Sequence, residues 1–262
     1  TWNQYGGWAT GPQQEATGHF YPKKINGKWW LVDPEGRLFW SHGPTCVRIF
    51  EARTPISDRE HLYEWLPERD GKFAFAYGKG KGAPFAYYKD KEYVTMCFAA
   101  ANLYRKYGEN WSAIYSDRIH RRLSSWGMNT IANWSSMDIA RMRRTPYVVS
   151  LGARGIFIEG SKGHWGKFPD PFAPEFAASL RRSLGNYDFA YEDPWCIGFF
   201  INNEMSWGND GVSLAKATVA SPATQPAKIA MQAWLKEKYR DLAALNQAWR
   251  SDYASWDDWL AK

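Results

Sequence analysis

The sequence has little of what metal-dependent or disulfide-stabilised proteins need. Only three cysteines and five histidines occur among its 262 residues. Cys46, Cys97 and Cys196 show no metal-type spacing, and an odd number of cysteines does not indicate a disulfide framework. We therefore expect three free thiols, with Cys46 and Cys196 as small core residues. We expect neither a catalytic metal nor any other cofactor.

Other common signals are also missing. No apolar run is long enough to span a membrane, and no Gly-x-Ser-x-Gly motif indicates a hydrolase with a serine nucleophile. The Gly-Lys-Gly-Lys-Gly run at 78–82 lacks the Lys-Ser/Thr ending of a phosphate-binding loop, so we interpret it as a mobile, solvated loop. The net charge is +6, but the basic residues are spread thinly apart from 141–144. We therefore expect no nucleic-acid partner.

Aromatic residues, by contrast, are abundant. The 16 Trp, 15 Tyr and 14 Phe make up 17% of the chain. A large core is one explanation for this excess. A sugar-binding cleft is the other, because the apolar face of a pyranose ring stacks on a flat indole.

The stretch 195–208 carries the strongest functional signal. An apolar run from Cys196 stops abruptly at Asn202-Asn203-Glu204. Such a run predicts a strand buried on both faces, as in a parallel sheet, and polar residues at the carboxyl end of such a strand are where α/β barrels place their chemistry. A purely structural alternative is that Glu204 is the first solvated residue after the strand. Trp207 follows closely and offers a flat apolar face beside the carboxylate.

The remaining pattern alternates strands and helices, which indicates an α/β fold. Residues 1–22 have no clear period and form an irregular lead-in. Asn26-Gly27 and the Asp-Pro-Glu-Gly turn at 33–36 predict a hairpin. Four buried strands are expected at 38–47, 128–133, 147–151 and 196–202. Helices are expected at 111–126, 138–143, 174–184 and 226–239, with an amphipathic helix and a turn in the tail.

Two long loops separate these elements. The segment 48–110 is rich in Gly, Lys and Tyr, and we expect short helices in it, one of them around 92–107. The segment 152–174 contains Glu159, His164 and Trp165. Because each loop follows a strand, both are expected on the face that carries Glu204.

Three segments, in order, resemble clan A retaining glycoside hydrolases; the first two resemble the family 50 β-agarases in particular, and the third resembles clan A galactosidases and agarases. The first is Gly-Lys-Trp-Trp-Leu-Val-Asp-Pro-Glu-Gly at 27–36, which leads into Phe-Trp-Ser-His-Gly at 39–43. The second is Gly-Phe-Phe-Ile-Asn-Asn-Glu-Met-Ser-Trp-Gly at 198–208. The third is the Leu-Asn-x-Ala-Trp phrase at 245–249, followed by Trp-Asp at 256–257. The resemblance implies a (β/α)8 TIM barrel, of which this chain supplies about the first four strands with long loops.

The resemblance also implies roles for individual residues. Glu204 matches the general acid/base, and Asn203 matches the asparagine that contacts the sugar 2-hydroxyl. The aromatic surroundings, Trp207 in particular, are expected to desolvate Glu204 and raise its pKa. Further substrate contacts, for each of which a structural role is an equal alternative, are expected from His42, Arg48, Asn133, Trp134, His164 and Trp165. Asn133-Trp134 stands where many clan members have an Arg, which weakens any transfer of subsite detail.

The implied activity is hydrolysis of a β-galactan such as agarose or agaro-oligosaccharides by a double displacement. A β-galactosidase-like or sulfated-galactan hydrolase and a non-catalytic glycan-binding module are the alternatives. Clan A enzymes take a second Glu, the nucleophile, from the seventh strand, and no later strand exists here; neither Glu159 nor Glu192 ends a buried strand. We therefore expect 1–262 to be the N-terminal part of a single catalytic domain.

On that interpretation, the partners are a polysaccharide or oligosaccharide and the remaining half of the barrel, with no membrane partner. Expressed alone, the chain is expected to aggregate or dimerise through open sheet edges and to be inactive. Thr1 is not an initiator Met, so we expect a removed signal peptide or an upstream domain, and a secreted or periplasmic location.

Overall fold

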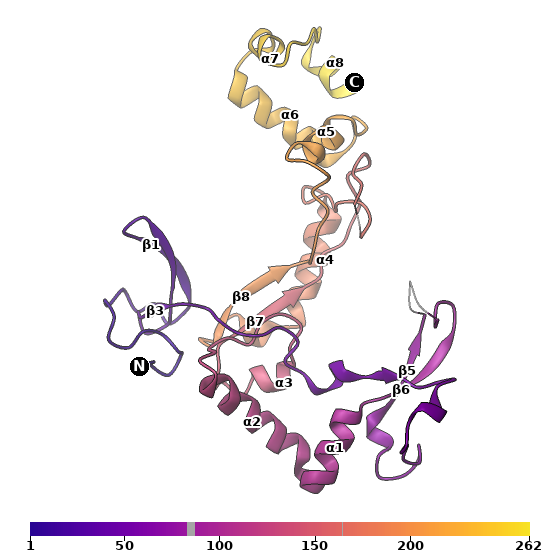
Figure 1. Cartoon of the computed structure of the whole chain (residues 1–262). Helices are drawn as coiled ribbons and strands as arrows, with labels where there is room; N and C mark the ends of the chain where they lie inside the picture. Colours follow the sequence, from indigo (N-terminus) through magenta and orange to yellow (C-terminus); the bar gives the residue numbers. More distant parts are fainter. Residues whose placement is uncertain (83–86, 164) are drawn as a thin grey trace. The chain divides into compact units, whose positions relative to one another are not determined.

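The computed structural model describes residues 1–82, 87–163 and 165–262. It divides into two compact units, the first formed by 1–148 with 193–198 and the second by 149–192 with 199–262. Two strands, β7 (Tyr147–Leu151) and β8 (Cys196–Ile201), pass from the first unit into the second (Figure 1). Within the described ranges no helix is long and apolar enough to cross a bilayer.

The first unit opens with the hairpin that the turn residues predict. Strands β1 (Tyr21–Ile25) and β2 (Lys28–Val32) are antiparallel, and β3 (Leu38–Phe39) pairs with the other edge of β2. The turn residues Asn26 and Gly27 both have positive φ, as a two-residue hairpin turn that matches strand twist requires. In the second turn, buried Asp33 accepts hydrogen bonds from the N–H groups of Glu35 (3.0 Å) and Arg37 (2.8 Å).

Four segments of the first unit run parallel, in the order that the sequence predicts. The N–H of Ala132 donates to the carbonyl of Pro44 (2.9 Å), and the N–H of Val148 donates to that of Ile131 (3.1 Å). Ile131 also bridges to Tyr147 in parallel, and Tyr147 N–H donates to the carbonyl of Trp195 (2.9 Å). The chain therefore has an α/β architecture with adjacent parallel segments, although no closed barrel is formed by the described residues.

The expected strand 38–47 is wrong in extent, because regular strand ends at Phe39. Pro44 has no N–H to donate, and Cys46 has a positive φ of 56°. Gly43 packs so closely on the backbone of Thr130 that a Cβ would have no room there. The stretch 42–46 is still joined to 129–133 by backbone hydrogen bonds, but these bonds do not form a continuous strand ladder. The expected strand 128–133 is likewise reduced to a single bridge at Ile131.

A second antiparallel sheet corrects two further expectations. Its order is β4 (Thr54–Pro55), β6 (Glu92–Met96), β5 (Tyr77–Lys81). The glycine-lysine run is thus mostly strand β5 and not a loop, because it pairs with β6 over five residues. The helix expected around 92–107 begins only at Phe98, since its first residues form β6.

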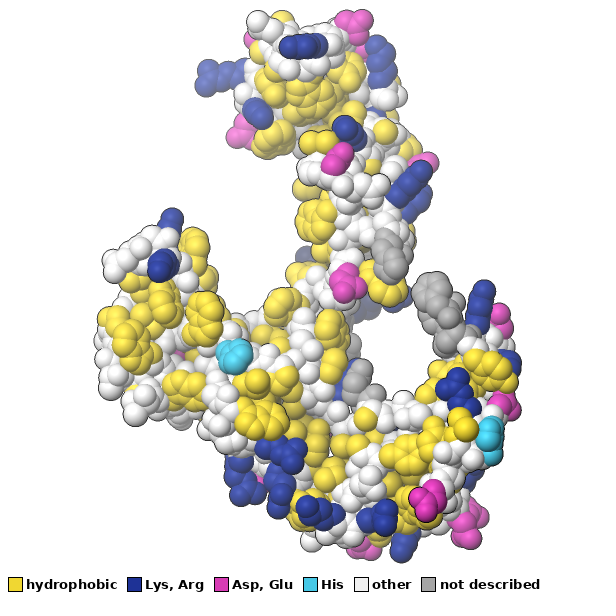
Figure 2. All heavy atoms as spheres, viewed as in Figure 1, with side chains coloured by type: hydrophobic (Ala, Val, Ile, Leu, Met, Phe, Trp, Pro, Cys, Tyr) yellow, Lys and Arg dark blue, Asp and Glu magenta, His cyan; other side chains and the backbone are white. Residues whose placement is uncertain are grey.

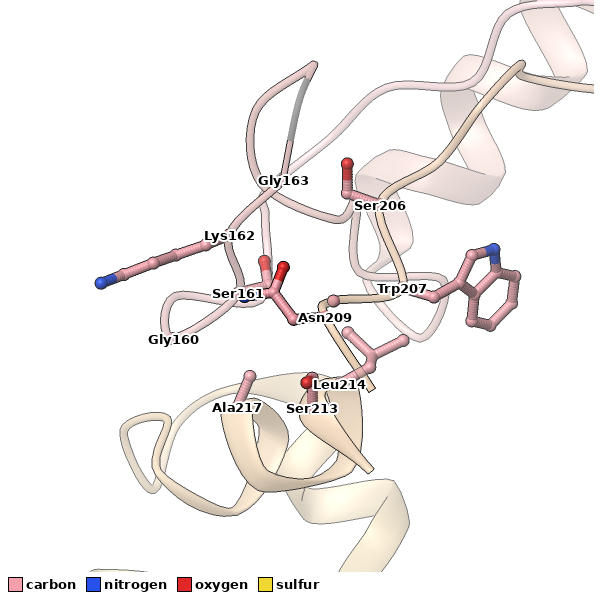
Figure 3. A pocket seen from close by; sticks show the side chains of 11 residues that line it. Gly160, Ser161, Lys162, Gly163, Ser206, Trp207, Asn209, Ser213, Leu214 and Ala217 are labelled. Carbon is pink, nitrogen blue, oxygen red and sulfur yellow. The ribbon is translucent and has the colours of Figure 1, made fainter. Parts of the chain in front are cut away.

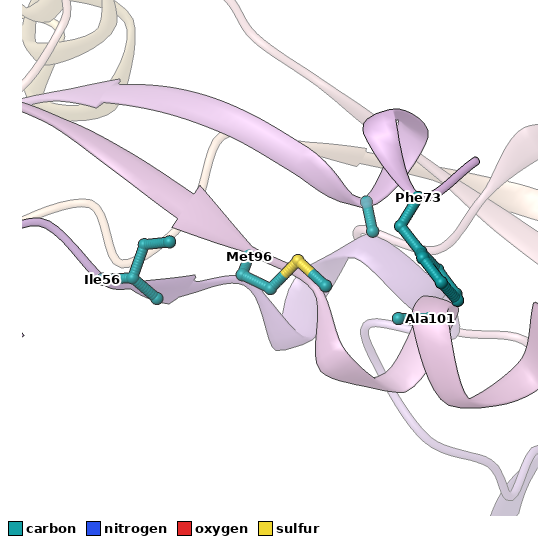
Figure 4. Close-up of a cluster of buried hydrophobic side chains, with 5 residues drawn as sticks. Ile56, Phe73, Met96 and Ala101 are labelled. Atoms are coloured by element: carbon teal, nitrogen blue, oxygen red, sulfur yellow. The ribbon is translucent and has the colours of Figure 1, made fainter. Parts of the chain in front are cut away.

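The core of this sheet lies against helix α1 (Phe98–Tyr107). Buried Ile56, Phe73, Met96 and Ala101 form one cluster there (Figure 4). Helix α2 (Trp111–Ser125) confirms the predicted helix and stops before Gly127, which has a φ of 72°. The short helix α3 (Met137–Ala140) lies where one was expected. Single 3-10 turns occupy Ile49–Ala52, Glu60–Leu62, Ala74–Ala76 and Gly108–Asn110.

The second unit is mainly helical beyond the two strands. Helix α4 (Pro174–Gly185) and helix α6 (Pro226–Tyr239) both begin with proline, which suits the first helical position, and both were predicted. A 3-10 turn (Asp188–Ala190) and the short helix α5 (Ser213–Val219) lie between them. Helix α7 (Leu242–Trp249) and helix α8 (Trp256–Ala261) close a core around Leu235, Leu245 and Trp259.

The apolar run of β8 predicts a strand that is buried on both faces, and this prediction is wrong. Only Cys196 is buried, and Phe199, Phe200 and Ile201 are all exposed. All three cysteines are free, which confirms that expectation. Cys97 and Cys196 are buried and Cys46 is partly exposed. Desolvation raises the pKa of the Cys196 thiol to about 11.

Candidate active site

Glu204 lies three residues beyond the end of β8, at the carboxyl end of a strand, as predicted. The backbone turns sharply there, with positive φ at Asn202 (58°) and Glu204 (49°). Left-handed backbone is uncommon in residues other than glycine and concentrates at functional sites. The side chain of Glu204 is exposed, so the desolvation expected from the aromatic surroundings is not seen in this chain.

Asn202 anchors this turn, a role that the sequence did not reveal. Its side chain accepts a hydrogen bond from the N–H of Ala153 (2.8 Å) and donates one to the carbonyl of Ala153 (3.0 Å). Its own N–H donates to the carbonyl of Leu151 (2.8 Å). The turn that carries Glu204 is thus tied to the chain just after β7. Neighbouring Asn203 is exposed and has no side-chain hydrogen bond within the described ranges, so its amide is available to a ligand.

Trp165 is the residue that contacts the carboxylate. Its indole N–H donates to Oε2 of Glu204 at 2.7 Å, although 39 positions separate the two residues. Trp207, which the sequence places beside Glu204, instead packs on Phe168 with ring centroids 4.9 Å apart. Its indole remains largely exposed.

Trp207 lines two hollows of the second unit. One has a volume of about 320 Å³ and is partly polar, with Lys162, Ser206 and Asn209 among its lining residues (Figure 3). The other has a volume of about 680 Å³ and is almost wholly apolar, with Phe172, Ile201, Met205 and Trp234 in its wall. Both volumes fall within the range of about 300–1,000 Å³ that is usual for small-molecule sites.

The loop between β7 and α4 is held by a buried carboxylate. Asp170 is fully buried and accepts hydrogen bonds from the side-chain amide of Gln225 (2.6 Å) and the N–H of Ala227 (2.9 Å). Its second oxygen accepts from the N–H of Phe172 (2.9 Å). Gln225 in turn accepts from the N–H of Glu159 (3.3 Å). These bonds fasten the loop that carries Trp165 to the start of α6.

Among the other predicted contact residues, four belong to the first unit: His42, Arg48, Asn133 and Trp134. His42 borders a hollow of about 270 Å³ that four indoles line: Trp2, Trp8, Trp30 and Trp40. Its backbone N–H donates to the side chain of Asn129 (2.9 Å). Figure 2 shows hydrophobic side chains gathered on the surface over β1–β3. In this part of the chain, the side chains of Trp29 and Trp40 are 68% and 72% exposed.

Asn133 and Trp134 end the second parallel segment. The Oδ1 atom of Asn133 is buried and has no hydrogen-bond partner among the described residues. Trp134 is exposed and has a φ of 61°, a strained conformation for a bulky residue. Both features are typical of a site that another group completes. His164 lies outside the described residues. No group of three His, Cys, Asp or Glu side chains within the described ranges could hold a metal ion.

Comparison with known proteins finds no matching family model. The chain is 33% identical to β-agarase B of Vibrio sp. (strain JT0107) over 96% of its own length and 29% of that protein. It is 28% identical to β-agarase A of the same strain, over 90% of its own length and 26% of that protein. The chain therefore spans less than a third of the curated relatives that it matches.

Solved structures give the same answer. The structure of PfGH50B superposes with a TM-score of 0.80 at 31% identity, covering 99% of this chain and 42% of that one. The agarase AgWH50C gives a TM-score of 0.79 at 31% identity, with 99% and 40% covered. An exo-β-agarase gives 0.78 at 28% identity, with 100% and 42% covered.

These similarities show that the chain resembles part of agarase-like glycoside hydrolases. Within that class it is similar over its whole length to the family 50 β-agarases. The resemblance based on three short sequence segments is thereby confirmed.

Proposed function

We propose that the protein to which this chain belongs hydrolyses β-glycosidic bonds of agarose or agaro-oligosaccharides with retention of configuration. Glu204 is the general acid/base. The observation that carries this assignment is the exposed Glu204 carboxylate at the end of β8, on an anchored turn of left-handed backbone. The similarity to β-agarases supports the substrate class.

The chemistry requires a second carboxyl group. Retaining glycosidases hold two carboxyl groups about 5–5.5 Å apart. Glu204 gives its proton to the glycosidic oxygen while the second carboxylate attacks the anomeric carbon and forms a glycosyl-enzyme. Glu204 then takes a proton from water, whose oxygen displaces the enzyme carboxylate. We assign the nucleophile to sequence outside this chain. Asn203 donates to the sugar 2-hydroxyl as positive charge develops on the ring.

The fold proposal follows from the same assignment. Residues 1–262 supply about four strands of a (β/α)8 barrel, preceded by the lead-in 1–22, whose last two residues begin β1. The remaining half of the barrel covers the exposed edge of β8. Trp207, Trp165, His42, Asn133, Trp134 and His164 are proposed sugar contacts. Secretion or a periplasmic location would suit a polysaccharide substrate.

A matched pair of variants in the full-length protein tests the assignment. Glu204→Gln keeps the size of the side chain but removes the proton, and hydrolysis of agaro-oligosaccharides should fall by about 10²–10⁴-fold, the usual contribution of a general acid. Glu237→Gln, an exposed position on α6, is the control and should behave as the parent. Proton NMR of the first product formed should show the β-anomer. Unchanged hydrolysis by Glu204→Gln would refute the proposal.

A glycan-binding module is the second candidate, and the exposed indoles of the first unit favour it. Trp2, Trp8, Trp29 and Trp40 all present large apolar surfaces to solvent, which suit stacking on sugar rings. If the full-length protein binds agaro-oligosaccharides but never cleaves them, this second function replaces the first.

A further inference from the structure

The hydrogen bond between Trp165 and Glu204 distinguishes the two oxygens of the carboxyl group. An indole N–H can only donate, so the oxygen that it contacts must act as an acceptor. That oxygen is Oε2, at 2.7 Å. When the carboxyl group is protonated, the proton therefore resides on the other oxygen, Oε1. A free carboxyl group has no such preference.

We propose that Trp165 is a positioning residue, which fixes the Glu204 carboxyl group so that Oε1 carries the proton to the glycosidic oxygen. The inference rests on the proposed function of Glu204. It replaces the substrate contact that the sequence predicts for Trp165 with a contact to the catalytic carboxyl group.

Both partners sit on anchored backbone, as a positioning contact requires. The loop that carries Trp165 is closed at its base, where Ile158 N–H donates to the carbonyl of Phe168 (2.9 Å). Between them, the hydroxyl of Ser161 accepts from Phe168 N–H (2.8 Å) and donates to the carbonyl of Ile158 (2.6 Å). On the other side, Asn202 holds the turn before Glu204. The indole thus approaches the carboxylate from a loop whose two ends are held together by hydrogen bonds.

The experiment uses the full-length protein and two substrates with the same sugar. Trp165→Phe keeps an aromatic face for stacking but removes the N–H. One substrate is an agaro-oligosaccharide, whose leaving group needs a proton, and the other is a nitrophenyl glycoside, whose leaving group does not. The control is Trp126→Phe, because Trp126 is exposed to a similar degree and belongs to the first unit.

A positioning role gives an effect that depends on the leaving group. Trp165→Phe should lower kcat on the oligosaccharide by about tenfold, the loss expected for one hydrogen bond to a charged group, with KM unchanged. On the nitrophenyl glycoside the loss in kcat/KM, which reports formation of the glycosyl-enzyme, should be less than about twofold, since acid catalysis contributes little there. Trp126→Phe should match the parent on both substrates.

Two other outcomes are separable. An equal loss on both substrates, or an effect on KM alone, would show that Trp165 stacks on the sugar and would overturn the positioning role. A Trp165→Phe variant that behaves as the parent would also overturn it. Glu204→Gln is measured beside it on the same substrates. If Glu204→Gln hydrolyses the oligosaccharide at the parental rate, the proposed function itself has failed, whatever Trp165→Phe does.

Discussion

Replacement of Asp170 by alanine should destabilise the second unit more than any surface change. The carboxylate is fully buried, and it is the acceptor for two donors, the Gln225 amide and the Ala227 N–H, that are themselves buried. Its third donor, the N–H of Phe172, belongs to an exposed residue. Loss of the carboxylate leaves two buried donors without a partner, at a cost of about 1–3 kcal/mol each. We therefore expect Asp170→Ala to cost about 2–6 kcal/mol.

Two further variants make the estimate specific. In Asp170→Asn, the amide oxygen can take the place of Oδ2 and serve both buried donors, while the amide NH2 faces the Phe172 N–H, which can bond to water. That variant should cost only about 1–2 kcal/mol. Asp241→Ala is the control, because Asp241 also accepts a backbone N–H at a helix start, from Ala244, but at an exposed site. Loss of such a cap costs about 1 kcal/mol.

Hydrogen exchange of the first amides of α6, followed by mass spectrometry, measures the effect locally. The expected order of lost protection is Asp170→Ala, then Asp170→Asn, with Asp241→Ala leaving α6 unaffected. If Asp170→Ala loses no more protection than Asp170→Asn, the buried donors do not depend on the carboxylate and the reasoning is wrong.

Three other predictions concern charge and exposed apolar surface. Burial lowers the pKa of His120 below its ordinary value of 6.5. Below about pH 6.5 the unfolded state therefore binds more protons than the folded state, and the first unit loses stability as the pH falls. His120→Leu should abolish this loss, as measured by urea titrations at about pH 7.5 and 5.5. Burial also lowers the pKa of Lys228, whose ammonium donates to the carbonyl of Ser221 (2.8 Å). Stability should therefore rise with pH up to about 10.5, and Lys228→Met should remove that slope in thermal unfolding. The 262-residue chain alone should self-associate through exposed β8 and show no hydrolysis, whereas Phe200→Lys should make it more monomeric in light scattering; a monomeric, active parental chain would contradict both expectations.

Elements with local signals could be predicted from the sequence. Asn26-Gly27 specifies its hairpin turn because both positions need positive φ. Pro226 and Pro174 mark helix starts because proline suits the first helical position. The carboxyl end of β8 is marked by the abrupt change at Asn202, because the apolar run of the strand ends where polar residues begin.

Features that depend on distant partners could not be predicted. The strand β5 has a glycine-rich sequence typical of a loop, and it is a strand only because β6 pairs with it. The contact of Trp165 with Glu204 joins two loops without periodicity. Nothing in the sequence distinguishes Asn202 from Asn203. The side chain of Asn202 forms two hydrogen bonds with the backbone of Ala153, whereas Asn203 is exposed.

The three free cysteines make the chain its own reporter of strand opening. Alkylating reagents react with thiolate, and a thiol whose pKa is about 11 holds only a trace of it near neutral pH. Cys196 should therefore be modified only in molecules in which β8 has opened and exposed this residue, and partly exposed Cys46 should be modified first. Timed alkylation followed by peptide mapping would then give the opening rate of β8, with the modification of Cys46 as the internal reference for the rate of the reagent.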